Sequence, residues 1–246
     1  MRIQSNFNTN YKMPSFGTSS RVIVRKDNSI ICNITWFFRE DLNWRDFINV
    51  IAAKFRYAKD VNVLNLGCSD GSEPLSLMTG LLHFAREYAD KFFPIKAFDI
   101  DEKIISDAKS GIYNIRESDL RTINNTLGTY TDYFSMTSRR NSESGLALKL
   151  LPAYSKNVTF EQMNLLDTIK YLKPLNNIVL CRNVLPYLKE EDRELFINNL
   201  SNRMDDSSLL VIGSFDRGHN VDDLIRSKGF VHYGNENVFI KGAAGV

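Results

Sequence analysis

The stretch VNVLNLGCSDGSEPLS, residues 61–76, decides the fold. Its first part, VNVLNLG (61–67), is an apolar run that ends in glycine, which is typical of a strand covered on both faces. Gly67 and Gly71 then let the backbone turn, and the segment 72–92 has the composition of a helix. This order suits a nucleotide or a similar ligand in the crevice outside the strand ends. The spacing is GxxxG rather than the dinucleotide fingerprint GxGxxG, so an ordinary strand-to-helix turn remains an alternative at this point.

Strands and helices alternate along the rest of the chain. Further strands are predicted at 95–99, 157–163, 176–182 and 207–214, helices at 101–111, 189–204 and 221–229, and an antiparallel pair at 230–242. Towards the N-terminus, 21–34 has the pattern of two short strands, and 35–55 has the apolar spacing of a helix or helix pair. The alternation predicts an α/β fold of the Rossmann-like class, with a mostly parallel sheet and helices on both faces.

One stretch, residues 112–156, interrupts this alternation. At about 45 residues it is too long for a structureless loop inside a compact domain, so we expect a small inserted subdomain there. The predicted organisation is therefore an N-terminal extension at 1–34, partly disordered or strand-like, and one domain at 35–246 that carries the insertion.

Composition argues against several classes of protein. The chain has 31 Lys and Arg residues against 29 Asp and Glu residues, whereas nucleic-acid binders usually carry a strong basic excess. Its three cysteines form no CxxC pair and its three histidines have no ligand spacing, which argues against a metal site. The N-terminus lacks the apolar core of a signal peptide, and no apolar run reaches the roughly 18 residues of a membrane span. We therefore expect a cytoplasmic protein without nucleic acid, metal or membrane insertion.

Asp99 adds a second indication of the ligand. It ends the predicted strand at 95–99, where a carboxylate can bridge the two hydroxyls of a ribose. The alternative is an N-cap for the helix that starts near Asp101, a position that favours aspartate. Because the sequence reads Asp-Ile-Asp, one carboxylate is present for each task, and the glycine turn together with Asp99 favours a ribose-bearing ligand.

Five segments, in order, resemble the CheR family of chemotaxis-receptor methyltransferases. They are TWFFRE (35–40), GCSDGSEPLS (67–76), FDIDEKIISDAKSGIY (98–113), MNLLD (163–167) and CRNVLPYL (181–188). The first is similar to the family's Thr-x-Phe-Phe-Arg segment and the last to its Cys-Arg-Asn-Val-x-x-Tyr-Phe segment. The resemblance implies a methyltransferase that uses S-adenosylmethionine (SAM), releases S-adenosylhomocysteine and methylates a glutamate carboxylate. It also implies a protein substrate, a chemoreceptor-like or other signalling protein.

The resemblance further implies roles for single residues. Arg39 and Tyr187 would form the catalytic pair at the methyl-transfer centre. Residues from all five segments would bind the cofactor: Thr35, Arg39, Gly67, Glu73, Asp99, Asn164, Leu165 and Asn183. Within this set, Glu73 would hold the ammonium group of SAM and Asp99 its ribose. A glutamate acceptor has a pKa of about 4.3 and is already anionic at neutral pH, so the site needs a cation such as arginine rather than a general base.

Two alternatives remain open. The chain has only 34 residues before its Thr-x-Phe-Phe-Arg segment, where the family's chemotaxis members carry a helical domain, and this favours a different acceptor, a small molecule or another side chain. In addition, Ser72, Leu75 and Pro186 depart from the family's pattern. Those departures favour a catalytically silent SAM-binding module that regulates or scaffolds a partner.

Overall fold

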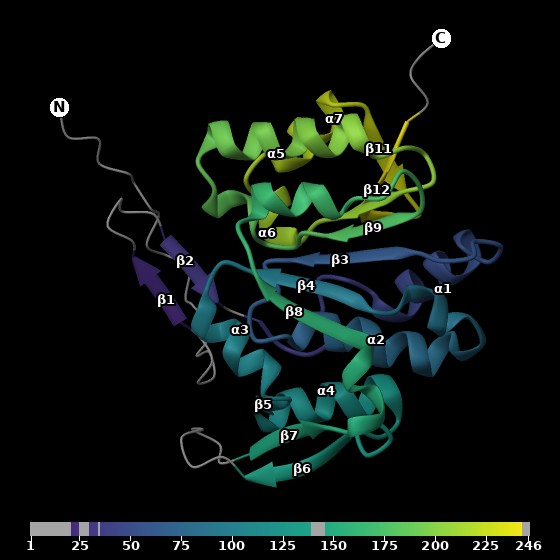
Figure 1. Cartoon of the computed structure of the whole chain (residues 1–246), viewed down its shortest axis with the longest axis vertical. Helices are drawn as coiled ribbons and strands as arrows, with labels where there is room; N and C mark the ends of the chain where they lie inside the picture. The colour runs from purple at the N-terminus through teal and green to yellow at the C-terminus, as the bar shows by residue number, and fades with distance from the viewer. Residues whose placement is uncertain (1–20, 25–29, 34, 139–145, 243–246) are drawn as a thin grey trace.

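A computed structural model describes residues 21–24, 30–33, 35–138 and 146–242. Its centre is a seven-stranded sheet with the strand order β11-β12-β10-β9-β3-β4-β8 (Figure 1). Neighbouring strands from β10 to β8 run parallel, and β12 runs antiparallel to both β10 and β11. The mostly parallel Rossmann-like sheet with an antiparallel last pair is thereby confirmed. The predicted disorder within 1–34 falls largely outside the described residues.

The strands of this sheet are short and mostly buried. Their bounds are β3 Asn62–Leu66, β4 Ile95–Asp99, β8 Val158–Gln162, β9 Asn177–Leu180, β10 Leu209–Val211, β11 Phe230–Tyr233 and β12 Asn235–Lys241. Side chains alternate between the two faces of a strand, so Val63 and Leu64 enter different cores although both are buried. Because both faces are covered, β3 can be apolar throughout most of its length.

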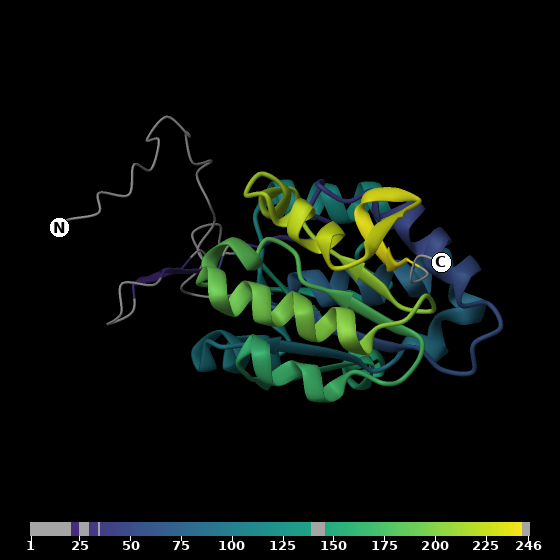
Figure 2. The same cartoon turned by 90° about the horizontal axis from the view of Figure 1, so that it is seen from above.

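Helices cover the two faces of the sheet (Figure 2). The core on one face includes residues of α1 (Trp44–Lys54), α2 (Ser72–Phe84) and α3 (Glu102–Lys109). The core on the other includes residues of the 3-10 helix η3 (Leu165–Tyr171), α5 (Glu190–Arg203) and α7 (Val221–Ser227). These two cores hold the sheet between helical layers.

The helix predicted over 72–92 is interrupted. Helix α2 ends at Phe84, because Ala85 leaves the helical region with φ −138° and ψ 39°. The chain continues as the 3-10 helix η1 (Arg86–Phe92). Similarly, the apolar pattern of 35–55 yields one helix, α1, while 35–43 forms turns in front of it.

The residues of the predicted insertion include a separate three-stranded antiparallel sheet, at the lower end of the molecule in Figure 1. It consists of β5 (Ile112–Asn114), β6 (Phe134–Ser138) and β7 (Leu146–Leu150), accompanied by α4 (Glu117–Leu127) and the 3-10 helix η2 (Pro152–Asn157). Phe37 makes edge contacts with Phe134 and Tyr113, at centroid distances of 5.6 and 6.2 Å. This aromatic contact ties the small sheet to the segment that contains Arg39. A further antiparallel pair, β1 (Arg21–Val24) with β2 (Ile30–Asn33), matches the two strands predicted at 21–34.

The chain reverses direction across the sheet at β3. From β3 it proceeds to β4 and β8 on one side and then returns to β9 on the other. Ligands of open α/β sheets bind at such a switch point, outside the carboxyl ends of the strands. Gly67, Asp99 and Arg182 each follow or end one of the strands β3, β4 and β9, so all three lie at this edge of the sheet.

Candidate functional site

The glycine turn after β3 and the end of β4 are joined by hydrogen bonds. The backbone N–H groups of Gly67 and Cys68 both donate to the carbonyl of Phe98, at 2.8 and 2.9 Å. Gly67 has φ +72°, and a Cβ atom there would lie 2.4 Å from Cγ2 of Val184. Glycine is therefore required both by the backbone conformation and by the loop that follows β9.

Asp99 lies beside this turn, with its carboxylate mostly buried. One oxygen accepts a hydrogen bond from Ser69 N at 2.9 Å and the other from Asp101 N at 3.0 Å. Asp101 is the residue that caps α3, through its contacts with the N–H groups of Lys103 and Ile104. Burial raises the pKa of Asp99, against the opposing effect of the two backbone donors. The cap thus belongs to Asp101, and the Asp99 carboxylate needs no helix-capping role to explain its position.

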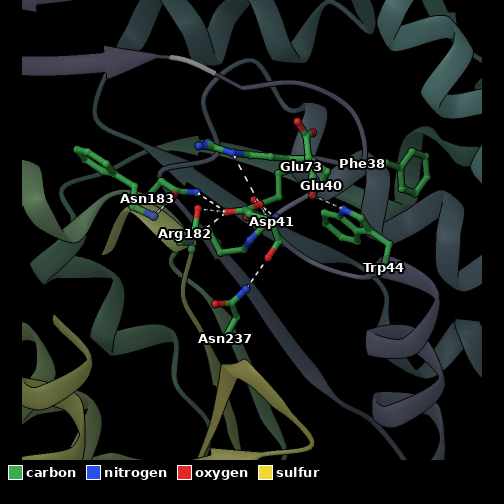
Figure 3. Close-up of polar contacts among 12 residues, drawn as sticks. Phe38, Glu40, Asp41, Trp44, Glu73, Arg182, Asn183 and Asn237 are labelled. Carbon is green, nitrogen blue, oxygen red and sulfur yellow. Dashed lines mark hydrogen bonds and ion pairs between the residues drawn. The ribbon is translucent and has the colours of Figure 1, made fainter. Parts of the chain in front are cut away.

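A buried arginine joins the turn to the N-terminal segment of the domain (Figure 3). The Arg182 side chain is 0% exposed and forms ion pairs with Glu73, at 2.6 Å from Nη1 to Oε2, and with Asp41 through Nη2. The other oxygen of Glu73 accepts from Asn65 Nδ2 at 2.6 Å. A buried guanidinium is stable only when it is paired and hydrogen-bonded, and these carboxylates supply the pairing.

Asp41 is the centre of the polar contacts in Figure 3. Besides Arg182, its carboxylate accepts from Ser214 N at 3.1 Å and from Asn183 Nδ2 at 3.3 Å. Its backbone carbonyl accepts from Asn237 Nδ2 in β12. Burial alone would raise the pKa of Asp41, but the charges of Arg182 and Arg39 and these hydrogen bonds hold it below its usual value. Asp41 therefore remains an anion that connects segments far apart in the sequence.

A second buried aspartate shapes the loop after β9. Asp216, in the short helix α6 (Ser214–Arg217), accepts backbone hydrogen bonds from Asn183, Val184 and Leu185, and also from Gly213. Asn183 has φ +60°, a conformation that asparagine tolerates better than most residues. Burial raises the pKa of Asp216 to about 6, against the effect of the four donors. These contacts hold Asn183 in its left-handed conformation at the strand end.

Arg39 and Tyr187, the predicted catalytic pair, make different contacts at this network. The Arg39 guanidinium is 4.5 Å from the centroid of the Trp36 ring, and its Nε is 3.8 Å from Oδ1 of Asp41. Tyr187, in the 3-10 helix η4 (Leu185–Tyr187), packs against Phe215 with a centroid distance of 5.5 Å. Arg39 thus contacts Asp41 directly, whereas Tyr187 is linked to Asn183 through Phe215, whose N donates to Asn183 Oδ1 at 2.9 Å. Their roles stay predictions.

The remaining predicted residues have local contacts of their own. Asn164 caps η3 by accepting from Leu166 N at 3.0 Å, and Leu165 is buried behind it. Thr35 is half-buried, two residues before the buried Phe37. None of these contacts tests a role in cofactor binding, so the assignments of all three residues to the cofactor site stay predictions.

Unsatisfied buried atoms at the same edge fit a ligand with both donors and acceptors. Of the five buried side-chain atoms without a hydrogen-bond partner in the described part of the chain, three lie at this edge: Asn65 Oδ1, Ser69 Oγ and Arg182 Nε. Such atoms are rare in folded proteins and call for a ligand or a solvent molecule. Because SAM carries an ammonium group, a carboxylate and ribose hydroxyls, the polar groups around β3, β4 and β9 suit it chemically.

Several residues of the network could not be assigned from the sequence. Arg182 belongs to the recognised CRNVLPYL segment and Asp41 follows TWFFRE directly, yet neither has a predicted role. Arg182 is 109 positions from its partner Glu73 and 141 from its partner Asp41, so no local spacing could indicate the pairing. The only sequence signal for these two residues is weak: Arg182 follows an apolar run and Asp41 an aromatic one.

Other kinds of site receive no support from the part of the chain that the structure describes. No group of three or more His, Cys, Asp or Glu residues there could hold a metal ion. Cys68 and Cys181 are buried, and burial raises the pKa of both thiols well above the usual value, which makes them poor nucleophiles. In the same described ranges, no helix has the length and apolar character needed to cross a bilayer.

Comparison with known proteins identifies the family. A family model described as the SAM-binding domain of CheR methyltransferase matches residues 33–230. A probable chemotaxis protein methyltransferase of Rhizobium etli is 28% identical, over 75% of this chain and 68% of its own length. Chemotaxis protein methyltransferases of Borreliella burgdorferi and Vibrio cholerae are 25% and 23% identical, over 80% and 82% of this chain and 68% of each relative. The chain belongs to the CheR methyltransferase family and is a SAM-dependent methyltransferase.

Proposed function

We propose that the enzyme transfers the methyl group of SAM to the side-chain carboxylate of a glutamate in a protein, with a signalling protein of the chemoreceptor kind as the substrate. The observation that supports this proposal is the placement of Arg39. Its side chain is 20% exposed and lies next to Asp41, which contacts Arg182 and Asn183. A partly exposed cation beside the buried network is suited to bind an incoming anion.

The chemistry assigned to Arg39 is orientation of the acceptor. A glutamate carboxylate with a pKa of about 4.3 is ionised at neutral pH, so its oxygen can attack without a general base. In the reaction one oxygen forms a bond to the methyl carbon, while the carbon–sulfur bond breaks and leaves its electron pair on sulfur. An arginine can hold the acceptor in line because its planar donors match both oxygens of a carboxylate.

Glu73 and Asp99 are proposed to bind the cofactor from the other side. The two Glu73 oxygens accept from Asn65 and Arg182, and a carboxylate offers about four lone-pair sites, so it retains capacity for an ammonium group. The positive charge of Arg182 would repel that ammonium if it were unopposed. Its ion pair with Asp41 offsets this charge, and the arrangement is therefore compatible with a cationic ligand.

The experiment combines purified protein, methyl-labelled SAM and a lysate of the source cells, followed by mild alkali. A carboxyl methyl ester releases volatile labelled methanol, whereas methyl groups on nitrogen or sulfur stay attached. We expect methanol from the wild type and a nearly complete loss of it in Arg39→Ala. The loss should be nearly complete because the substitution removes a charge-assisted bidentate contact that aligns the acceptor.

The matched control is Arg45→Ala. Arg45 also lies over an aromatic ring, with Cζ 5.2 Å from the centroid of Phe84, but it is an exposed residue of α1. This variant should retain wild-type methanol release. Alkali-stable label would mean that the methyl acceptor is a group other than a carboxylate. Bound SAM without label in any fraction would favour the silent regulatory module. Equal activity of Arg39→Ala and the wild type would remove Arg39 from the mechanism.

A further inference from the structure

Trp36 occupies the unspecified position of the Thr-x-Phe-Phe-Arg segment, to which the family resemblance assigns no role. Its half-buried indole lies against the Arg39 guanidinium, at 4.5 Å from Cζ to the ring centroid. An arginine over a tryptophan face is attracted by the negative charge of the ring face. The contact therefore restrains the side chain that is proposed to hold the acceptor.

The backbone between Trp36 and Arg39, and the Arg39 carbonyl itself, are held by contacts with the rest of the domain. Phe37 and Phe38 are buried, and Phe38 N donates to Ser76 Oγ of α2 at 2.8 Å. The Arg39 carbonyl accepts from Trp44 Nε1 at 3.0 Å. Because the backbone is held in this way, the remaining freedom of Arg39 is the rotation of its long side chain.

The indole ring of Trp36 has two further contacts, with Glu40 and Arg116. Its Nε1 donates to Glu40 Oε2 at 2.8 Å. Arg116 lies with Cζ 6.0 Å from the ring centroid, and Asp119 accepts from its Nε and Nη2 at 3.1 and 2.8 Å. Arg116 is thus already engaged by a carboxylate and acts as a fixed neighbour of the ring. A fixed ring can define the position of the guanidinium that stacks on it.

Asp41 restrains the same guanidinium from its edge. The ion-pair contact of Arg39 with Asp41 is made by Nε, at 3.8 Å, rather than by the terminal nitrogens. A guanidinium has five donors in a planar fork, and the two terminal nitrogens are the pair that faces a carboxylate end-on. Among the described residues, Trp36 thus engages the face of the guanidinium and Asp41 its Nε edge, and the end with the terminal nitrogens is the part assigned to the acceptor.

We propose that Trp36 is a positioning residue of the acceptor site: its ring, together with the Asp41 carboxylate, holds Arg39 with the terminal nitrogens directed to the acceptor. The role of Arg39 towards an acceptor carboxylate rests on the proposed function. The restraint of Arg39 by Trp36 does not, so the two can be tested separately.

The first test measures the restraint without any acceptor. In a proton–nitrogen NMR spectrum of arginine Nε–H groups, the signal of Arg39 is the one missing in Arg39→Lys. A nearby indole ring displaces that signal, and we expect it to move towards the position of a solvent-exposed arginine in Trp36→Leu. An Arg39 signal at the same position in the wild type and Trp36→Leu would overturn the proposal, whether or not the protein methylates any acceptor.

The second test measures the consequence for transfer. Trp36→Leu should lower kcat/KM for the protein acceptor by about three- to tenfold, the range expected for loss of a partly desolvated cation–π contact. The dissociation constant of SAM, measured by titration calorimetry, should change less than kcat/KM, although some change is expected because Trp36 makes its contact with Arg39, which is predicted to serve the cofactor as well as the acceptor. Trp36→Phe keeps an aromatic face and should recover most of the lost kcat/KM.

Each other kinetic outcome contradicts the proposal. An unchanged kcat/KM in Trp36→Leu would mean that Arg39 needs no help from the ring. Parallel losses in kcat/KM and SAM affinity, with no recovery in Trp36→Phe, would indicate a structural role instead. If the wild type forms no methyl ester, the proposed function fails, while the NMR comparison still decides whether Trp36 restrains Arg39.

Discussion

Replacing Asp41 with asparagine should destabilise the fold, because it removes one of two carboxylates that neutralise a fully buried guanidinium. Asp41 is 11% exposed in its side chain, and its partner Arg182 is 0% exposed. The same carboxylate accepts from Ser214 N and Asn183 Nδ2. Asparagine keeps one acceptor oxygen but turns the other position into an amide donor that faces these N–H groups.

The magnitude follows from the bonds that are lost. A hydrogen bond to a charged group contributes about 1.5–3 kcal/mol, and a buried donor left without a partner costs about 1–3 kcal/mol. Breaking a buried ion pair by removing one partner costs about 3–5 kcal/mol, and here Glu73 remains on Arg182, which favours the lower end. We therefore expect the free energy of unfolding to fall by about 3 kcal/mol.

The assay is urea denaturation at neutral pH, with the midpoint and the slope fitted together so that a change in stability is separated from a change in exposed surface. Asp60→Asn is the control. Asp60 also pairs with a cation, Lys173, but their side chains are 64% and 46% exposed. Such a surface pair contributes at most about 1 kcal/mol after screening by solvent. If both variants lost the same small amount, the Arg182 network would not stabilise the fold, and the reasoning from burial would be refuted.

Two further predictions concern the carboxylates at the strand ends. Asp99→Ala should weaken SAM binding by about 1–3 kcal/mol, the cost of leaving buried hydroxyls unpaired. Asp101→Ala should alter mainly the cap of α3. Titration calorimetry compares the two variants, and equal dissociation constants for Asp99→Ala and the wild type would remove Asp99 from the site. The pKa of Asp216 is about 6 in the folded protein against an ordinary value of 3.8, so the folded state keeps a proton that the unfolded chain has lost between these values. The free energy of unfolding should consequently fall by up to about 3 kcal/mol as pH rises from about 4 to about 6; Asp216→Asn should lack this slope in denaturation curves, and a slope of the same size in the variant would assign it to other groups.

The sequence was most informative where burial imposes a local pattern. Apolar runs ending in glycine or aspartate predicted β3 and β4, and Asp-Ile-Asp divided the carboxylates between the strand end and the cap of α3 as the structure has them. The break at Ala85 was not predictable, since alanine favours helix and the interruption depends on how α2 and η1 pack. Local propensity is overridden there by tertiary contacts.

At the candidate site, too, local features could be predicted from the sequence and long-range pairings could not. A strand end, a glycine turn and a family segment can be located from one stretch of sequence at a time. The pairing of Arg182 with Asp41 and Glu73 cannot be located in this way, because it joins three segments that are far apart in the sequence. These are the N-terminal segment, the glycine turn and the loop after β9, which meet only in the folded structure. Recognising CRNVLPYL indicated that this loop belongs to the site, but not that its arginine turns inward.

The inward arginine gives the site a physical connection between its two sides. Glu73 lies on the side proposed for the cofactor, Asp41 on the side of Arg39, and Arg182 pairs with both at once. A shift of either carboxylate changes the pairing of a guanidinium that has no access to water, and such a change is costly. The carboxylate that contacts Arg39 and the carboxylate proposed to bind the cofactor are therefore both paired with the same buried group. For the proposed transfer from a cationic cofactor to an anionic acceptor, this connection would let correct geometry on one side stabilise correct geometry on the other.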